Sequence, residues 1–62
     1  MVDGLIKEMA DTKTILVVDD ERDLLELITL VLRQEGYHVK KATDGRVALE
    51  SVERAMPDLI LL

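Results

Sequence analysis

The sequence predicts an α/β fold, in the form of a strand–helix–strand–helix–strand (βαβαβ) half of a doubly wound parallel sheet. Residues 14–18 (TILVV) and 59–62 (LILL) are unbroken aliphatic runs, which is typical of strands buried on both faces. Between them, two stretches with apolar residues at helical spacing flank a short polar strand. Strands that alternate with helices predict a parallel sheet with right-handed crossovers. The chain has 62 residues, enough for one domain at most.

The first strand, 14–18, ends abruptly at Asp19 and Asp20. The helix that follows is predicted to place these apolar residues, at steps of three and four, on its core face: Leu24, Leu25, Ile28, Val31 and Leu32. Asp20 is in position to cap the start of this helix. Gly36 stands where helices commonly end in a left-handed residue, so we expect the helix to end there.

The second strand, 38–42 (HVKKA), is more polar and suits the edge of a sheet. Thr43 or Asp44 can cap a second helix. The apolar side of this helix is predicted to consist of Val47, Ala48, Val52 and Ala55, with Leu49 beside them. Pro57 disfavours the helical conformation in the residue before it and therefore stops the helix. Residues 59–62 then begin a third buried strand.

Composition excludes several classes of protein. There is no cysteine and only one histidine, so disulfides, thiolate metal sites and histidine-rich clusters are excluded. The net charge of −5, the lack of a basic patch and the single aromatic residue predict no direct binding to nucleic acid. No apolar run approaches the roughly 20 residues that span a bilayer, and residues 1–13 lack a signal sequence, so we expect no membrane association. Residues 1–13 are expected to be a flexible leader of a cytoplasmic protein.

Asp19 and Asp20 are the candidate site residues. Ligands of open parallel sheets bind beyond the carboxyl ends of the strands, and here the first strand ends in two adjacent carboxylates. Magnesium prefers oxygen ligands, and proteins often hold it by one or two carboxylates with waters and a phosphate. An acidic pair between a strand and a helix is also explained by capping alone, so the local pattern leaves both interpretations open.

The same corner argues against a nucleotide-binding enzyme. A dinucleotide fold places a glycine-rich turn after the first strand, whereas residues 19–23 (DDERD) contain no glycine and repel phosphate unless a cation intervenes. The sequence also offers no plausible nucleophile or general base beyond exposed carboxylates. We therefore predict that the chain is not an enzyme. Tyr37, His38, Asp44 and Asp58 are interpreted as structural or surface residues.

Four motifs occur in order and at consistent spacing: ILVVDDE, GYHV, ATDG followed by AL, and PDLIL. With these motifs, residues 14–62 closely resemble the N-terminal half of bacterial two-component response-regulator receiver domains. The resemblance implies a flavodoxin-like receiver fold that is truncated within the third strand. It also implies phosphorelay signalling with a sensor histidine kinase as the partner.

The resemblance assigns roles to the acidic pair. It implies that Asp20 binds Mg²⁺ directly and that Asp19 acts chiefly through water, while Asp20 can also cap the helix. The phosphoacceptor aspartate is expected immediately after Leu62. The residues present therefore contain no catalytic group, and the isolated chain is expected to bind Mg²⁺ weakly or not at all and to resist phosphorylation.

A second hypothesis is a self-assembling half-domain. The strand at Leu59–Leu62 would offer an unpaired apolar edge, and such an edge is a template for pairing with another chain. Two copies could then form a homo-oligomeric flavodoxin-like sheet with no signalling activity. A third hypothesis, a small metal- or nucleotide-dependent enzyme, lacks support because the phosphate-binding glycine loop is missing.

Overall fold

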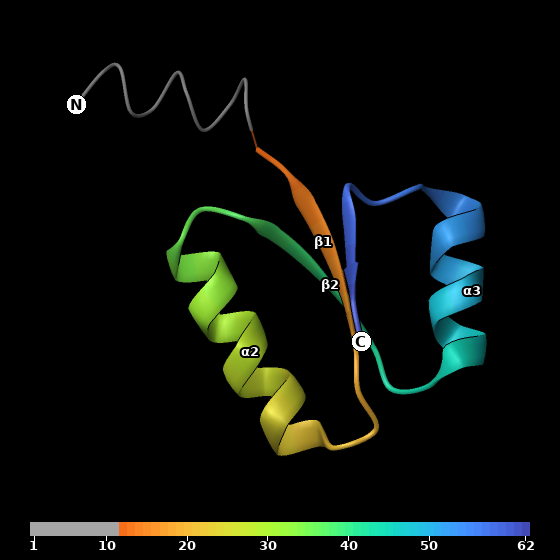
Figure 1. Ribbon diagram of the computed structural model, residues 1–62, viewed down its shortest axis with the longest axis horizontal. Helices are drawn as coiled ribbons and strands as arrows, with labels where there is room; N and C mark the ends of the chain where they lie inside the picture. The colour runs from red at the N-terminus through yellow and green to blue at the C-terminus, as the bar shows by residue number, and fades with distance from the viewer. Residues whose placement is uncertain (1–11) are drawn as a thin grey trace.

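The computed structural model describes residues 12–62, and it confirms the predicted order of elements (Figure 1). The elements are β1 (Thr14–Val18), α2 (Arg22–Gln34), β2 (His38–Ala42), α3 (Gly45–Arg54) and β3 (Leu59–Leu61). The predicted fold class is therefore correct. Residues 1–11 of the predicted leader lie outside the described residues. Lys13 already contacts the sheet, because its carbonyl oxygen accepts a hydrogen bond from the backbone N–H of His38 at 2.8 Å.

The three strands form one parallel sheet in the order β2-β1-β3. The chain thus moves to one side of β1 to form β2 and then crosses to the other side to form β3. Because both crossovers in such a sheet are right-handed, the two helices must cover opposite faces. Figure 1 shows this arrangement, with α2 and α3 on either side of the sheet.

The central strand β1 supplies half of the buried apolar residues in the described part of the chain. Its residues alternate between the two faces, as strand geometry requires. On the α2 side, the core consists of Ile15, Val17, Leu25 and Val39, with Ile28 and Leu32 packed against it. On the other side, Leu16 and Ala42 are buried at 0% and 2% exposure. The prediction that residues 14–18 form a strand buried on both faces is confirmed.

The predicted core face of α2 is only partly correct. Leu25 is buried and Ile28 and Leu32 are half-buried, but Leu24 and Val31 are 39% and 49% exposed. The helix is rotated so that positions 25, 28, 29 and 32 form the stripe that faces the sheet. The neighbouring apolar positions lie on either side of this stripe. This rotation buries Thr29, and its hydroxyl oxygen has no hydrogen-bond partner within residues 12–62. A buried hydroxyl without a partner costs about 1–3 kcal/mol.

Local sequence signals explain where the helices end. Gly36 follows α2 with a φ of +97°, a left-handed conformation that favours glycine, and this confirms the predicted end of the helix. At the start of α3, Asp44 rather than Thr43 is the cap, and its Oδ1 accepts a hydrogen bond from the N–H of Val47 at 2.9 Å. The helix ends at Arg54, before Pro57, as predicted.

The third strand differs from the prediction in burial. It spans Leu59–Leu61, and all three of its side chains are exposed, at 39% to 55%. The reason is topological, because β3 lies at one side of the sheet and neither α2 nor α3 contacts it. Its start is held to β1 by Asp58, whose N–H donates to the Thr14 carbonyl oxygen at 2.8 Å. The Oδ2 of Asp58 accepts a hydrogen bond from the N–H of Thr14 at 2.7 Å.

Within residues 12–62, neither helix has the length and apolar character needed to cross a membrane.

Candidate functional site

The candidate site lies at the carboxyl edge of the sheet, where parallel strands end together. Val18 is paired with Ala42, and the N–H of Asp19 donates to the Ala42 carbonyl oxygen at 3.0 Å. On the other side, Val17 is paired with Leu61. If this register continues, Leu62 lies beside Val18, and the next position along the chain lies beside Asp19. The edge between β1 and β3 is also where the strand order reverses, which is the usual ligand position in open α/β sheets.

The two aspartates of the acidic pair play different local roles. Asp19 is half-buried, and its Oδ1 accepts a hydrogen bond from the N–H of Glu21 at 2.9 Å. Asp20 is exposed and makes no side-chain hydrogen bond or ion pair with the described part of the chain. The N-cap of α2 is Glu21, and no side chain caps the helix in the usual way. The prediction that Asp20 caps this helix is therefore wrong: Glu21 occupies the N-cap position, and its N–H donates to the side chain of Asp19 rather than to that of Asp20.

The donor set of this pair is compatible with magnesium. One oxygen of Asp19 is engaged by the backbone, so its second oxygen and both oxygens of Asp20 remain available to a cation. Two carboxylates supplemented by waters and a phosphate oxygen form a usual Mg²⁺ environment. Among residues 12–62, however, no cluster of three or more His, Cys, Asp or Glu side chains has the arrangement of a metal site. The pair is thus suited to be part of a site that also takes oxygens from elsewhere.

Of the other titratable residues singled out from the sequence, three lie at the opposite edge of the sheet, and Asp44, at the carboxyl edge, is engaged in a helix cap. Asp44 is occupied in capping α3, and Asp58 joins the starts of β3 and β1 at the opposite edge of the sheet. His38 and Tyr37 are exposed and lie at the start of β2, also at that opposite edge. Their interpretation as structural or surface residues agrees with these positions.

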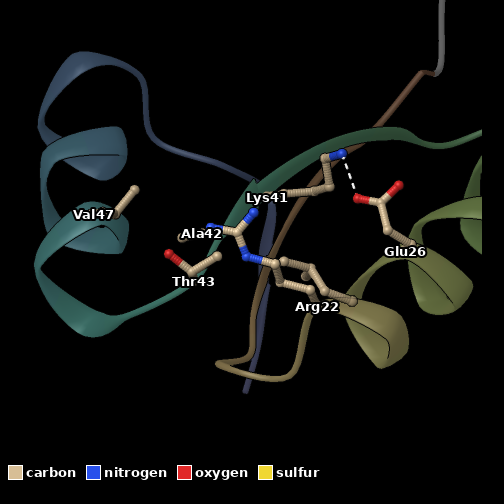
Figure 2. A pocket seen from close by; sticks show the side chains of 7 residues that line it. Arg22, Glu26, Lys41, Ala42, Thr43 and Val47 are labelled. Atoms are coloured by element: carbon tan, nitrogen blue, oxygen red, sulfur yellow. Dashed lines mark hydrogen bonds and ion pairs between the residues drawn. The ribbon is translucent and has the colours of Figure 1, made fainter.

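The sequence did not predict a pocket of about 400 Å³ that lies beside β2, at the edge that pairs with no described strand (Figure 2). It lies between the first turns of α2, the end of β2 and the start of α3, and Arg22, Glu26, Lys41 and Thr43 are its polar lining. Lys41 Nζ donates a hydrogen bond to Glu26 Oε1 at 2.7 Å. This hydrogen bond, and the charge of the same lysine, lower the pKa of Glu26 below its usual value.

The sequence did contain a signal for this ion pair. Lys41 follows the core residue Val39 by two positions, so its side chain lies on the face of the sheet that α2 covers. Glu26 immediately follows the core residue Leu25 on that helix. The ion pair can be predicted from these positions only when the face of the sheet on which Lys41 lies and the rotation of α2 are both known.

Comparisons with known proteins match this arrangement. Residues 15–62 match the response regulator receiver domain family. The DNA-binding response regulator MtrA of Mycobacterium tuberculosis is 50% identical over 48 residues, which is 77% of this chain and 21% of that protein. The alkaline phosphatase synthesis transcriptional regulatory protein PhoP of Bacillus subtilis is 48% identical over 50 residues, 81% of this chain and 21% of that protein. The chain therefore spans about a fifth of the length of these relatives. No solved structure matches the chain significantly.

Proposed function

The chain belongs to the response regulator receiver domain family, and we propose that its acidic pair is part of a phosphoryl-accepting site in a phosphorelay. The observation that supports this proposal best is the parallel register of β1 and β3. Continued by two positions, this register brings the residue after Leu62 beside Asp19. An aspartate there would share one edge of the sheet with both carboxylates of the pair.

In this proposal the acidic pair holds Mg²⁺, which supplies positive charge that offsets the charge of a transferring phosphoryl group. Asp20 would be the direct ligand, and the freedom of both of its oxygens from protein hydrogen bonds within residues 12–62 supports this role. Asp19 is oriented by the N–H of Glu21 and acts through its second oxygen, chiefly by way of water. Without a cation, two adjacent carboxylates would repel a phosphate group.

The proposed reaction is transfer of a phosphoryl group from a sensor histidine kinase. The nitrogen–phosphorus bond of the phosphohistidine breaks, and a phosphorus–oxygen bond forms on the aspartate that follows Leu62. The proposed location of this reaction is the cytoplasm. In this proposal the receiver domain that these residues begin accepts the phosphoryl group and does not turn over a free substrate as an enzyme would. These residues do not bind DNA in this proposal, since they carry a net charge of −5 and β1 ends in carboxylates.

The test compares the 62-residue chain with a form of the protein that continues through the later strands. Both are incubated with a small phosphodonor such as a phosphoramidate, with Mg²⁺ or with EDTA, and labelling is followed by intact mass spectrometry. We expect the extended form to gain one phosphoryl group only with Mg²⁺, and the 62-residue chain to gain none. Stable labelling of the 62-residue chain would contradict the proposed position of the acceptor.

A second candidate, self-association of the 62-residue chain, is favoured by the exposure of β3. Leu59, Ile60 and Leu61 are 39% to 55% exposed, and the outer side of β3 has no strand beside it in the described residues. We expect the chain to form a dimer or a larger species at micromolar concentration, measured by light scattering. Ile60→Lys should shift it toward the monomer, whereas Leu49→Lys, at an exposed position of α3, should not. A monomeric wild-type chain would rule this candidate out.

A further inference from the structure

We propose that the pocket between α2, β2 and α3 binds a small phosphate-bearing anion through Arg22, Lys41 and Thr43. This pocket is distinct from the acidic pair. The pocket lies at the edge of β2 that pairs with no described strand. Asp19 follows the central strand β1 and does not line the pocket. It also has the opposite charge, since its polar lining contains two cations and one carboxylate.

The three proposed donors come from separate segments that meet at this pocket. Arg22 begins α2, Lys41 is near the end of β2, and Thr43 precedes α3. Figure 2 shows the guanidinium group of Arg22 extending across the pocket toward the side of Thr43. Such a meeting of donors around a concave surface is typical of anion sites, and arginine suits phosphate because it can donate two parallel hydrogen bonds.

The donors retain the capacity to bind a ligand. Arg22 makes no ion pair or side-chain hydrogen bond with residues 12–62, so its guanidinium donors are available there. Lys41 is held in place by one hydrogen bond to Glu26, and its ammonium group has two further N–H donors. The apolar wall consists of Leu25, Ala42 and Val47, of which Leu25 and Ala42 are 3% and 2% exposed. The buried members of this wall belong to the core of the sheet, so the polar donors stand on fixed elements.

The carboxylate of Glu26 is expected to weaken the binding of the anion. It already neutralises part of the charge of Lys41 at 2.7 Å, and it would repel an incoming anion. We therefore expect charge removal at two neighbouring side chains to have opposite effects on the affinity for the anion. Removing the charge of Arg22 should weaken binding, and removing the charge of Glu26 should strengthen it.

The experiment is a titration of the 62-residue chain with inorganic phosphate, followed by two-dimensional ¹H–¹⁵N NMR at constant ionic strength. EDTA is present throughout, so that magnesium at the acidic pair cannot contribute and the outcome is independent of the proposed phosphorelay. We expect saturable shifts at the amides of Arg22, Lys41 and Thr43. Arg22→Gln should raise the dissociation constant about tenfold, and Glu26→Gln should lower it about threefold.

The matched control is Arg33→Gln, which makes the same change of side chain and charge in the last turn of the same helix. It should alter the dissociation constant by less than about twofold. Arg22 and Arg33 are both exposed, so neither change removes core packing. Arg33→Gln also removes the hydrogen bond of 3.4 Å that Arg33 Nη2 donates to the carbonyl oxygen of Val39, so the stability of both variants is measured alongside. Shifts that do not saturate, or equal effects of Arg22→Gln and Arg33→Gln, would overturn the proposal.

Discussion

Leu16→Ala is expected to unfold most of the chain at room temperature. Leu16 is 0% exposed at the middle of β1, the strand that both β2 and β3 pair with. Truncating a buried leucine to alanine costs about 2–5 kcal/mol, because transfer energy is lost and a cavity remains. A chain this short buries little surface and has little stability in reserve, so a loss of this size approaches its whole free energy of unfolding.

The matched control for this change is Leu27→Ala, which removes the same atoms from a side chain that is 57% exposed. It should change the free energy of unfolding by less than about 1 kcal/mol. Urea titrations followed by far-UV circular dichroism measure both variants under the same conditions. Equal losses in the two variants would mean that β1 does not form the core of the structure.

Asp20→Asn is expected to lower Mg²⁺ affinity at least about tenfold in a form of the protein that continues past Leu62, and to slow phosphorylation with it. Both carboxylate oxygens of Asp20 are free of hydrogen bonds and ion pairs within the described range, and the asparagine amide lacks the negative charge that attracts the cation. Asp19→Asn should have a smaller effect. Its amide oxygen can still accept the hydrogen bond from Glu21, so the turn is retained while one charge is lost.

Asp58→Asn controls for net charge in this experiment. Asp58 lies at the opposite edge of the sheet, where an asparagine oxygen can still accept the hydrogen bond from Thr14. Calorimetric titration with Mg²⁺ compares the three variants. If Asp58→Asn weakened binding as much as Asp20→Asn, the effect would be one of overall charge and the assignment of Asp20 would be wrong.

Much of the fold could be predicted from the sequence because its signals are local. The aliphatic run 14–18, Gly36, Asp44 and Pro57 each act through neighbouring backbone, and the structure confirms the elements that they delimit. The rotation of α2 could not be predicted in the same way. The apolar residues of α2 are spread around much of its circumference, so several different faces could pack on the sheet. Packing against β1 and β2 selected the face that buries Thr29.

The candidate site was predicted less completely than the fold. The sequence singled out Asp19 and Asp20 as metal-ligand candidates, and this role stays a prediction. It also placed the helix cap at Asp20, because capping preferences do not distinguish adjacent aspartates. The structure shows that Asp19 makes the hydrogen bond to Glu21. Burial of β3 was predicted from its aliphatic run alone, and this prediction was wrong. Aliphatic character favours burial, but burial requires a covering element, and neither described helix contacts this strand.

We expect the acidic pair to serve a phosphoacceptor located one position after Leu62. The most direct test phosphorylates a form of the protein that continues past this residue, reduces the acyl phosphate with borohydride, and locates the modified residue by peptide mass spectrometry. We expect modification of a single aspartate at the position that follows Leu62. Modification at Asp19, Asp20, Asp44 or Asp58 would contradict it.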